Sequence, residues 1–221
     1  MDVYEHLKRR LVSGDFRYAE KLRAEVLRTD YGCSASTIRE ALLRLSAVGL
    51  VDFQEQRGFR MPQYSRRRQH EVTEMRILLE QEGACRSIRN STVDWEARLN
   101  AAHHKLSHIE KRIAAKGPVD GLPDLWMEAE LEFHGTLLSG CGSAVLIDTH
   151  LMIYHQYRQI KVETDRRFVH LAENIREHQA IVDAALSSDE AKMRQSIVEH
   201  FERHLFTKEE LLEEDAAPIP A

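Results

Sequence analysis

The chain has 221 residues, of which 43% are hydrophobic and 30% charged, so it is long enough for one or two packed domains. No run approaches the roughly 18 consecutive apolar residues that span a bilayer, and the N-terminus lacks the apolar core of a signal peptide. We therefore expect a cytoplasmic protein with no membrane contact. The three cysteines, Cys33, Cys85 and Cys141, include no CxxC pair, which argues against a disulfide framework and a thiolate zinc site.

The net charge of −5 is unevenly distributed along the chain. Residues 1–68 carry 14 Lys and Arg against 9 Asp and Glu, whereas residues 69–221 carry 17 against 27. A basic N-terminal part joined to an acidic remainder is typical of a nucleic-acid-binding domain attached to a domain that does not touch the polyanion. A solvated surface without such a partner could show the same bias, so charge alone leaves both interpretations open.

The first 64 residues have the pattern of a winged helix-turn-helix domain. Helical periodicity predicts a helix over about 3–12, which Gly14 can end, and a second over about 20–29. A third begins at Ser34 or Ser36 as the cap, carries Ile38, Leu42 and Leu45 as its buried stripe, and closes at Gly49. Residues 51–61 then alternate apolar and polar side chains around a Gln-Arg-Gly turn, which predicts a short hairpin. Three helices followed by a two-stranded wing would place the third helix in the major groove of DNA.

The remainder of the chain has the periodicity of a helical bundle. Short breaks with Gly, Pro, Ser or Asp separate the apolar stripes, as is typical of antiparallel helices joined by tight loops. The predicted helices cover about 67–89, 93–115, 122–140, 143–164, 167–187 and 189–212. We therefore expect a mainly α protein with the winged domain at 1–64, an all-helical domain of about six helices at 65–213 and a disordered tail at 214–221.

Small and cationic side chains at the start of the third helix and in the hairpin are candidates for DNA contacts. Hydroxyl groups can reach phosphates or bases, and a guanidinium can pair with O6 and N7 of guanine. An ordinary solvated helix face could also carry such residues, and this alternative stays open on the pattern alone. The candidates are Ser34, Ser36, Thr37, Arg39, Arg57 and Arg60.

The stretch "YGCSASTIREALLRLSAVGLVDFQEQRGFRM", with "LVSGDF" and "LRAEVL" before it, resembles the GntR-type winged helix of bacterial transcription regulators. The resemblance covers about 60 residues and implies binding of a double-stranded DNA operator. Three features depart from the usual family pattern. Ala35 stands where an arginine commonly opens the recognition helix, Arg28 replaces a small residue, and "GDFRYAEKL" replaces a Pro-Gly turn. The operator sequence therefore cannot be copied from relatives.

Four polar side chains in the second half lie at positions that helical periodicity turns toward a core. Glu130 and His134 are four residues apart and share one face of a helix, so they could bind one cation together. His178 and His200 lie on the apolar stripes of two later helices. A histidine on such a stripe is more often a hydrogen-bonded core residue than a ligand, and the spacing alone leaves both interpretations open.

Residues 67–206, from "EMRILLE" through "ELEFHGTLLSGCGS" to "NIREHQAIVDAALSSDEAKMRQSIVEHFERHL", resemble the FCD effector domain of the FadR branch of GntR regulators. The metal ligands that the resemblance implies are Glu130, His134, His178 and His200. The family usually has Asp where this chain has Glu130, and commonly Asn where it has Ser143. Such ligands suit a divalent metal ion, zinc first and then nickel, manganese or iron. A metal-free polar pocket is the alternative.

Several other histidines have no matching family position. They are His104, His108, His150, His155, His170 and His204. We interpret most of them as surface residues or as residues that support the ligands. His204, one turn after His200, is the first candidate for an exception.

Together the two resemblances imply a ligand-responsive transcription regulator, which we expect to be a repressor. It would bind a palindromic operator as a homodimer, and a small organic acid in the helical domain would change its DNA affinity. Arg76 is the candidate that pairs with this effector, and a salt bridge is its alternative role. Two other functions stay open: a metal-dependent enzyme acting on an organic acid, and a regulator whose metal is purely structural. The winged helix argues against an enzyme, and no motif assigns a general base.

Overall fold

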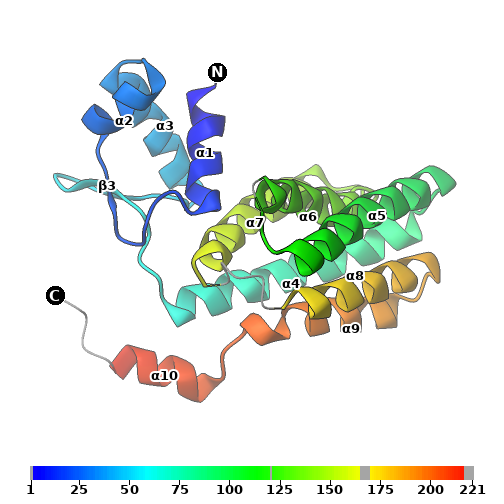
Figure 1. Cartoon of the computed structure of the whole chain (residues 1–221). Coiled ribbons are helices and arrows are strands. Elements are labelled where there is room, and N and C mark those ends of the chain that lie inside the picture. Colours follow the sequence, from blue (N-terminus) through cyan, green and yellow to red (C-terminus); the bar gives the residue numbers. More distant parts are fainter. Residues whose placement is uncertain (1, 120, 165–169, 217–221) are drawn as a thin grey trace. The chain divides into compact units, whose positions relative to one another are not determined.

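The computed structural model describes residues 2–119, 121–164 and 170–216 (Figure 1). The described chain divides into two compact units. The first contains residues 2–69 and 155–164, and the second contains residues 70–119, 121–154 and 170–216. The predicted fold class, a mainly α protein with a winged helix-turn-helix and an all-helical bundle, is confirmed. Among the described residues, no helix is both long and apolar enough to cross a bilayer.

Three helices of the first unit begin and end at local sequence signals. They are α1 Val3–Ser13, α2 Ala24–Tyr31 and α3 Ala35–Ala47. The side chain of Asp2 accepts a hydrogen bond from the N–H of Tyr4 at the start of α1, and Gly14 ends that helix in the left-handed conformation. Ser34 caps α3 by accepting from the N–H of Thr37. Of the two serines that could cap the third helix, the structure therefore uses the first.

The wing is a three-stranded antiparallel sheet in the order β1-β3-β2. Its strands are β1 Lys21–Leu22, β2 Asp52–Gln54 and β3 Gly58–Arg60. The hairpin of β2 and β3 was predicted, but β1 was not. The helix predicted from residue 20 begins only at Ala24, because Lys21 and Leu22 pair with β3, where buried Leu22 is the partner of Phe59. A strand of two residues has too few positions for its alternation to be recognised.

Aliphatic side chains form the core of the winged domain. Leu7 and Leu11 of α1 belong to one cluster with Ile38, Leu42 and Leu45 of α3, and all five are fully buried. The three residues of α3 are the stripe that helical periodicity predicts. Burial of apolar surface stabilises such a domain by about 25 cal/mol per Å². This packing fixes α3 against α1 and leaves the opposite face of α3 exposed.

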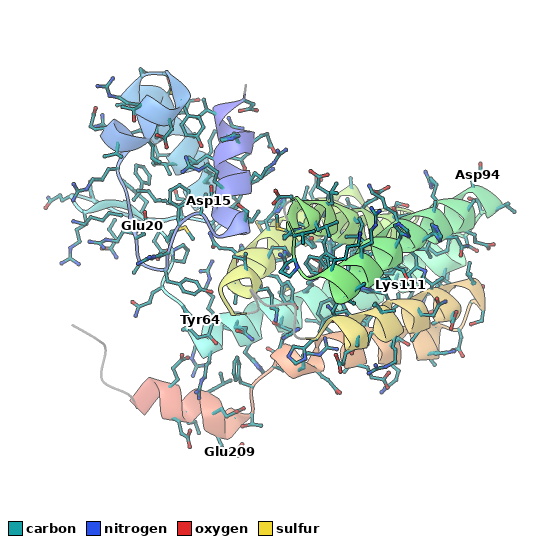
Figure 2. All side chains as sticks on the ribbon, in the orientation of Figure 1. Asp15, Glu20, Tyr64, Asp94, Lys111 and Glu209 are labelled. Atoms are coloured by element: carbon teal, nitrogen blue, oxygen red, sulfur yellow. The ribbon has the colours of Figure 1, made fainter. Side chains whose placement is uncertain are left out.

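Six long helices lie wholly or partly in the second unit, within the described residues (Figure 1). They are α4 Arg66–Arg89, α5 Val93–Lys116, α6 Leu122–Leu138, α7 Ala144–Thr164, α8 Leu171–Leu186 and α9 Glu190–Phe201. Helix α5 packs against α6 and α8, and α8 packs against α9. Exposed charged side chains such as Asp94 and Lys111 project from α5, as Figure 2 shows. The helix start predicted at residue 167 lies outside the described residues, and so does the part of the predicted tail (214–221) from residue 217 onward.

The prediction of one helix over 189–212 is wrong. Helix α9 ends at Phe201, and two further elements follow, η1 Glu202–His204 and α10 Lys208–Ala216. Thr207 and Glu210 form a capping box, in which each side chain accepts a hydrogen bond from the backbone N–H of the other. This pair begins a new helix, and α10 includes the first residues of the predicted tail.

Side chains of α4 and α7 bond to the end of α3 inside the first unit. Gln156 Nε2 donates to the carbonyl of Val48 at 3.0 Å, and Gln159 Nε2 donates to that of Leu50 at 2.9 Å. Arg68 of α4 donates to the carbonyl between them at 2.6 Å. These three carbonyls follow Ala47, the last residue of α3, and have no partner within that helix, so the donors satisfy backbone groups that need one. The end of α3 is thereby hydrogen bonded to two helices that continue into the second unit.

Candidate metal centre and nucleic-acid interface

The residues predicted to contact DNA from the third helix lie at its cap and first two turns. Ser34, Ser36, Thr37 and Arg39 are all exposed. The hydroxyls of Ser34 and Thr37 are hydrogen bonded to each other at 2.9 Å. The Arg39 guanidinium lies 3.2 Å from the carboxylate of Glu25 on α2, and both side chains are more than half exposed. This face of α3 therefore offers hydroxyls near the helix start and a guanidinium positioned by a carboxylate.

The two arginines predicted in the wing differ in their surroundings. Arg57 is exposed in the turn between β2 and β3, whereas Arg60 is half-buried and donates to the carbonyl of Ala19 at 3.2 Å. A groove of about 750 Å³ lies between α2, α3 and the wing, and Arg39 is part of its lining. Groove residues that sequence reasoning missed are Arg23, Val26, Leu43, Phe53 and Phe59. Exposed apolar side chains can contact the methyl group of thymine, but no periodic pattern marks them in a sequence.

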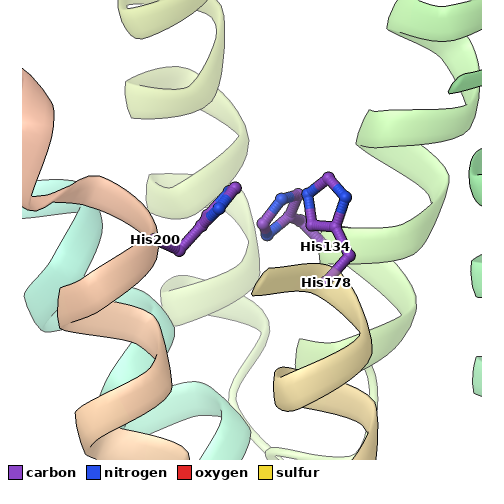
Figure 3. A group of neighbouring side chains, drawn as sticks. All are labelled: His134, His178 and His200. Atoms are coloured by element: carbon purple, nitrogen blue, oxygen red, sulfur yellow. The ribbon is translucent and has the colours of Figure 1, made fainter. Parts of the chain in front are cut away.

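Three of the predicted ligands meet inside the second unit (Figure 3). His134 comes from α6, His178 from α8 and His200 from α9, and all three side chains are buried. One ring nitrogen of each lies within 4.8 Å of a ring nitrogen of both others. We call these residues the three-histidine cluster. Imidazole nitrogens this close together can bind one metal ion.

The fourth predicted ligand, Glu130, is buried one turn before His134 but has different neighbours. Its carboxylate accepts a hydrogen bond from the Tyr154 hydroxyl at 3.0 Å and lies 3.6 Å from Nη2 of Arg76. Among the described residues, it does not belong to the group whose ligand atoms lie within 4.8 Å of one another. Glu130 therefore lies beside the three-histidine cluster, in contact with a guanidinium and a phenol.

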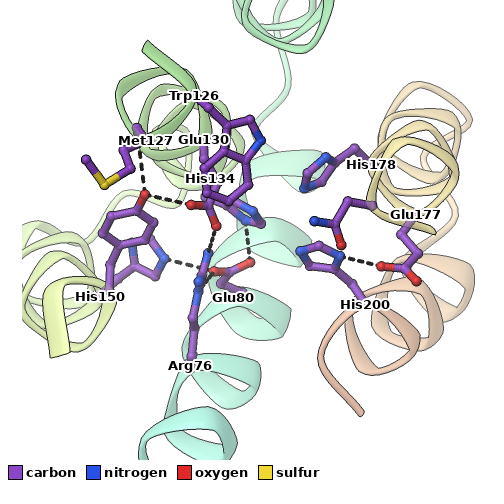
Figure 4. A network of polar contacts seen from close by, with 12 residues as sticks. Arg76, Glu80, Trp126, Met127, Glu130, His134, His150, Glu177, His178 and His200 are labelled. Carbon is purple, nitrogen blue, oxygen red and sulfur yellow. Dashed lines mark hydrogen bonds and ion pairs between the residues drawn. The ribbon is translucent and has the colours of Figure 1, made fainter. Parts of the chain in front are cut away.

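Arg76, the predicted effector contact, is fully buried within a polar network (Figure 4). Its Nε donates to Glu80 at 2.7 Å, while Glu130 is its more distant acidic neighbour. The guanidinium carbon lies 4.9 Å from the ring centroid of Tyr154 and 4.5 Å from that of Phe201. Two carboxylates and two aromatic rings stabilise a charge that burial alone would disfavour. Arg76 thus forms one ion pair within α4 and another with α6.

Glu80 connects this network to the three-histidine cluster. Its Oε2 lies 2.8 Å from Nδ1 of His134, and its Oε1 lies 3.0 Å from Nε2 of His150. Burial alone raises the pKa of Glu80, but His134 and Arg76 outweigh it and hold that pKa well below its ordinary value. Glu80 is therefore an ionised carboxylate at neutral pH, although it is fully buried.

The other two rings of the cluster also have a glutamate at Nδ1. Nδ1 of His200 lies 2.8 Å from Oε2 of Glu177. Nδ1 of His178 lies 3.1 Å from Oε1 of Glu110, at an angle outside that of a hydrogen bond. The same Oε1 accepts a hydrogen bond from Nε1 of Trp126 at 3.4 Å. Each ring of the cluster therefore has a carboxylate from another helix beside the same ring nitrogen.

The protonation of the cluster suits a cation. Burial lowers the pKa of His134 to about 4 against the opposing effect of Glu80, and burial with nearby His178 and Arg76 holds the pKa of His200 well below its ordinary value. Both rings are therefore neutral at pH 7, which is the form that binds metals. Within the described residues, Nε2 of His134 and of His178 are buried without a hydrogen-bond partner. Such atoms are rare in proteins, and a divalent cation would satisfy them.

Several supporting residues were missed in the sequence. They are Glu80, Glu110, Tyr154 and Glu177. Glu110 falls on the apolar stripe of α5 with Leu106 and Ile113, and this interruption by a charge is the signal that could have found it. Of the other histidines, His150 is buried and supports Glu80, whereas His204 is buried but lies outside the three-histidine cluster.

Comparison with known proteins accounts for both parts of the chain. Residues 1–61 match the family described as bacterial regulatory proteins, gntR family, and residues 71–203 match the FCD domain. The HTH-type transcriptional regulator BphR of Paraburkholderia xenovorans (strain LB400) is 33% identical over 205 residues, which cover 90% of this chain and 81% of BphR. The HTH-type transcriptional repressor GlaR of Escherichia coli (strain K12) is 28% identical over 204 residues, which cover 90% of this chain and 91% of GlaR.

Solved structures share the fold. McbR/YncC of E. coli superimposes with a TM-score of 0.74 at 20% identity, covering 91% of this chain and 92% of that one. A GntR transcriptional regulator from Rhodococcus sp. RHA1 superimposes with a TM-score of 0.72 at 18% identity, covering 98% and 97% of the two chains. At these identities the likeness concerns the fold alone.

Proposed function

The chain belongs to the GntR family of bacterial transcription regulators and carries an FCD domain, and from this premise we propose that it is a ligand-responsive repressor. The family and the relatives are transcription regulators and not enzymes. The protein acts in the cytoplasm as a homodimer. Helix α3 and the wing of each subunit contact a palindromic operator. A small organic acid in the FCD domain changes its affinity for DNA. The name of GlaR as a repressor supports the negative sign of regulation.

The observation that carries this proposal is the three-histidine cluster in the FCD domain. The neutral rings of His134 and His200 and the buried Nε2 atoms of His134 and His178 fit a divalent cation, with zinc as first choice and nickel, manganese or iron as alternatives. Glu130, one turn before His134, is the proposed fourth ligand. When bound, the cation supplies a positive charge and an open position at which an organic acid can bind.

Arg76 is the proposed second contact of the organic acid. Its guanidinium pairs with Glu80 at 2.7 Å and with Glu130 at 3.6 Å, so an incoming carboxylate would compete with the more distant Glu130. The flanking rings of Tyr154 and Phe201 restrict the guanidinium to one orientation. A fixed guanidinium is suited to a carboxylate because it presents paired donors to both oxygens. We therefore place the effector between the cation and Arg76.

Two helices can carry the response to the DNA-binding domain. Helix α7 contributes Tyr154 to the network of the second unit and Gln156 and Gln159 to the end of α3 in the first. Helix α4 contributes Arg76 to the network and Arg68 to the same end of α3. Because the recognition helices of a dimer must lie about one DNA turn apart, a shift of a few ångströms could abolish simultaneous binding.

The first test is metal analysis together with operator binding, on protein purified without chelator or nickel resin. We expect about one divalent ion per chain in the wild type, and loss of this metal in His178→Ala and Glu130→Ala. His104→Ala is the matched control, because His104 is exposed on α5 away from the cluster. We also expect organic acids to change operator affinity only in the metal-loaded protein.

Two outcomes would contradict parts of this proposal. Metal-free wild-type protein that responds to an organic acid would exclude a role for the metal in effector binding. Metal-loaded protein whose operator affinity responds to no organic acid would indicate a structural metal, and chelation would then lower the melting temperature alone.

A further inference from the structure

Each ring of the three-histidine cluster has a glutamate beside its Nδ1 atom, and these glutamates are not themselves proposed ligands. We propose that Glu80, Glu110 and Glu177 are positioning residues, which hold the three rings with a proton on Nδ1 and the lone pair of Nε2 toward one point. The cation is then bound through three Nε2 atoms, and its affinity depends on the glutamates. This inference rests on the proposed metal site and adds to it the residues that prepare the site before the metal arrives.

The contacts of Glu80 show how one ring is oriented. Its Oε1 accepts from Nε of Arg76 at 2.7 Å, and its Oε2 lies 2.8 Å from Nδ1 of His134. A carboxylate has no proton to donate, so Nδ1 of His134 is the donor of this hydrogen bond. A neutral imidazole carries one N–H, which leaves Nε2 with a lone pair. The same Nε2 is buried without a hydrogen-bond partner, within the described residues, as expected of an atom that binds a metal ion.

Glu177 acts on His200 in the same way. Its Oε2 lies 2.8 Å from Nδ1 of His200, and its Oε1 accepts a hydrogen bond from Arg203. Arg203 also donates to Asn174 at 2.8 Å, which fixes the guanidinium on α8. The arginine binds the other oxygen of the glutamate and so holds the carboxylate in place, as Arg76 does for Glu80. Two of the three rings therefore share one arrangement, in which an arginine orients a glutamate and the glutamate orients the histidine.

The third ring has a weaker support. Nδ1 of His178 lies 3.1 Å from Glu110 without hydrogen-bond geometry, and Trp126 donates to the same carboxylate oxygen. Glu110 is fully buried, and its Oε2 has no hydrogen-bond partner in the described part of the chain. We therefore expect Glu110 to contribute less than the other two glutamates.

The charges of this region match a divalent cation. The groups counted are the carboxylates of Glu80, Glu110, Glu130 and Glu177 and the guanidinium groups of Arg76 and Arg203. Four carboxylates and two guanidinium groups leave a formal excess of two negative charges, which one divalent ion neutralises. Carboxylates behind metal-bound histidines also raise the basicity of the rings. Removing one glutamate charge should therefore weaken metal binding even where the ligands are intact.

The test measures the affinity for Zn²⁺ by competition with a chromophoric chelator. We expect Glu80→Gln and Glu177→Gln to bind zinc about 10- to 100-fold more weakly than the wild type. An amide can donate or accept toward Nδ1, so either variant releases the ring from a single tautomer. Glu82→Gln is the matched control, since Glu82 lies on α4 near Glu80 in the chain but is partly exposed and pairs with Arg86 and Arg194. Its affinity should equal that of the wild type.

The tautomers of the histidine rings in metal-free protein give a second readout. They would not change if the glutamates only stabilised the fold. Nitrogen-15 NMR of the rings should show Nδ1–H tautomers for His134 and His200 in the wild type, and a mixture for the ring next to each substituted glutamate. Because Glu177 is partly exposed, Glu177→Gln provides the test even where Glu80→Gln fails to fold.

The outcomes separate this inference from the proposed function. Unchanged zinc affinity in the glutamine variants, or an Nε2–H tautomer at wild-type His134, would overturn the inference and leave the metal site standing. A wild type that binds no zinc or other divalent ion would overturn the metal site, and the tautomers would still decide whether the glutamates orient the rings.

Discussion

The interior of the winged domain is built from aliphatic side chains such as Leu7 and Leu42, whereas the FCD domain buries Arg76, Glu80 and His134 just as completely. A buried aliphatic side chain stabilises a fold by about 1.5–3 kcal/mol. A buried charge is destabilising by several kcal/mol unless its partner is present. The winged core therefore depends on volume and shape, but the polar part of the FCD interior depends on its charged partners being in place. Such an interior is easier to understand as a binding site than as a source of stability.

The largest effect is expected from removing a buried guanidinium. Arg76 and Glu80 form a fully buried ion pair at 2.7 Å, and Arg86 and Glu82 form an exposed pair with the same distance and spacing on the same helix. In metal-free protein, Arg76→Ala should lower the free energy of unfolding by about 3–5 kcal/mol, because Glu80 stays buried without its partner. Arg86→Ala should lower it by less than about 1 kcal/mol.

Urea unfolding followed by tryptophan fluorescence measures both variants, since Trp95 and Trp126 both lie in the FCD domain. Equal changes in the free energy of unfolding for Arg76→Ala and Arg86→Ala would contradict this prediction, because the buried ion pair would then contribute no more than the exposed one.

The next largest effect concerns the aliphatic core. Leu42→Ala should lower the free energy of unfolding of the winged domain by about 2–5 kcal/mol, because it removes buried methyl groups and leaves a cavity. Leu43→Ala, at the neighbouring exposed position, is the control and should have little effect. Circular dichroism reports on both domains, whereas fluorescence reports on the FCD domain. If Leu42→Ala lowers the midpoint of the fluorescence transition as far as that of the circular dichroism transition, the two domains unfold together.

A smaller effect is expected on the exposed face of the winged domain. Arg39→Ala should weaken binding to an operator selected from random DNA by about 1–3 kcal/mol and relax the preference at one base pair. Arg57→Ala, in the wing turn, should weaken binding to all sequences alike. It should also reduce the slope of log affinity against log salt concentration by about one. Titrations against single-base variants at several salt concentrations distinguish the two roles. Uniform weakening by Arg39→Ala would make Arg39 a phosphate contact.

The smallest effect concerns the hydrogen bonds at the end of α3. Gln156→Ala removes the donor to the carbonyl of Val48 and should destabilise the winged domain by about 1 kcal/mol. Gln195→Ala, whose side chain bonds to Glu199 on the surface of α9, is the control. Hydrogen exchange at the end of α3 should rise in the first variant only. Equal exchange in both variants would show that α7 does not stabilise the recognition helix.

The winged domain was predicted more completely than the bundle interior, because its signals are local. The cap at Ser34, the stop at Gly14 and the apolar stripe of α3 each depend on residues within a few positions of one another. The missed strand β1 is the exception, since its two residues form a strand only through pairing with β3.

In the FCD domain, the sequence identified the histidines but not their surroundings. The resemblance to the family pointed to His134, His178 and His200, and the structure brings these three together. Their role as metal ligands stays a prediction. Glu80 is 54 residues from His134 in the chain, and no spacing rule connects residues so far apart on different helices. The split between α9 and α10 was not predicted, although the capping box that begins α10 is local.

By itself, the sequence determined the helical class, most helix ends, the winged domain and the family to which the chain belongs. Only the tertiary structure decided that Glu130 lies against Arg76 and Tyr154, and that each ring of the cluster has its own glutamate. It also decided that the segment after α3 bonds to α4 and α7. The physical reason is the range of the interactions. Caps and periodicity act within about one helical turn, whereas contacts between helices depend on how the whole bundle packs.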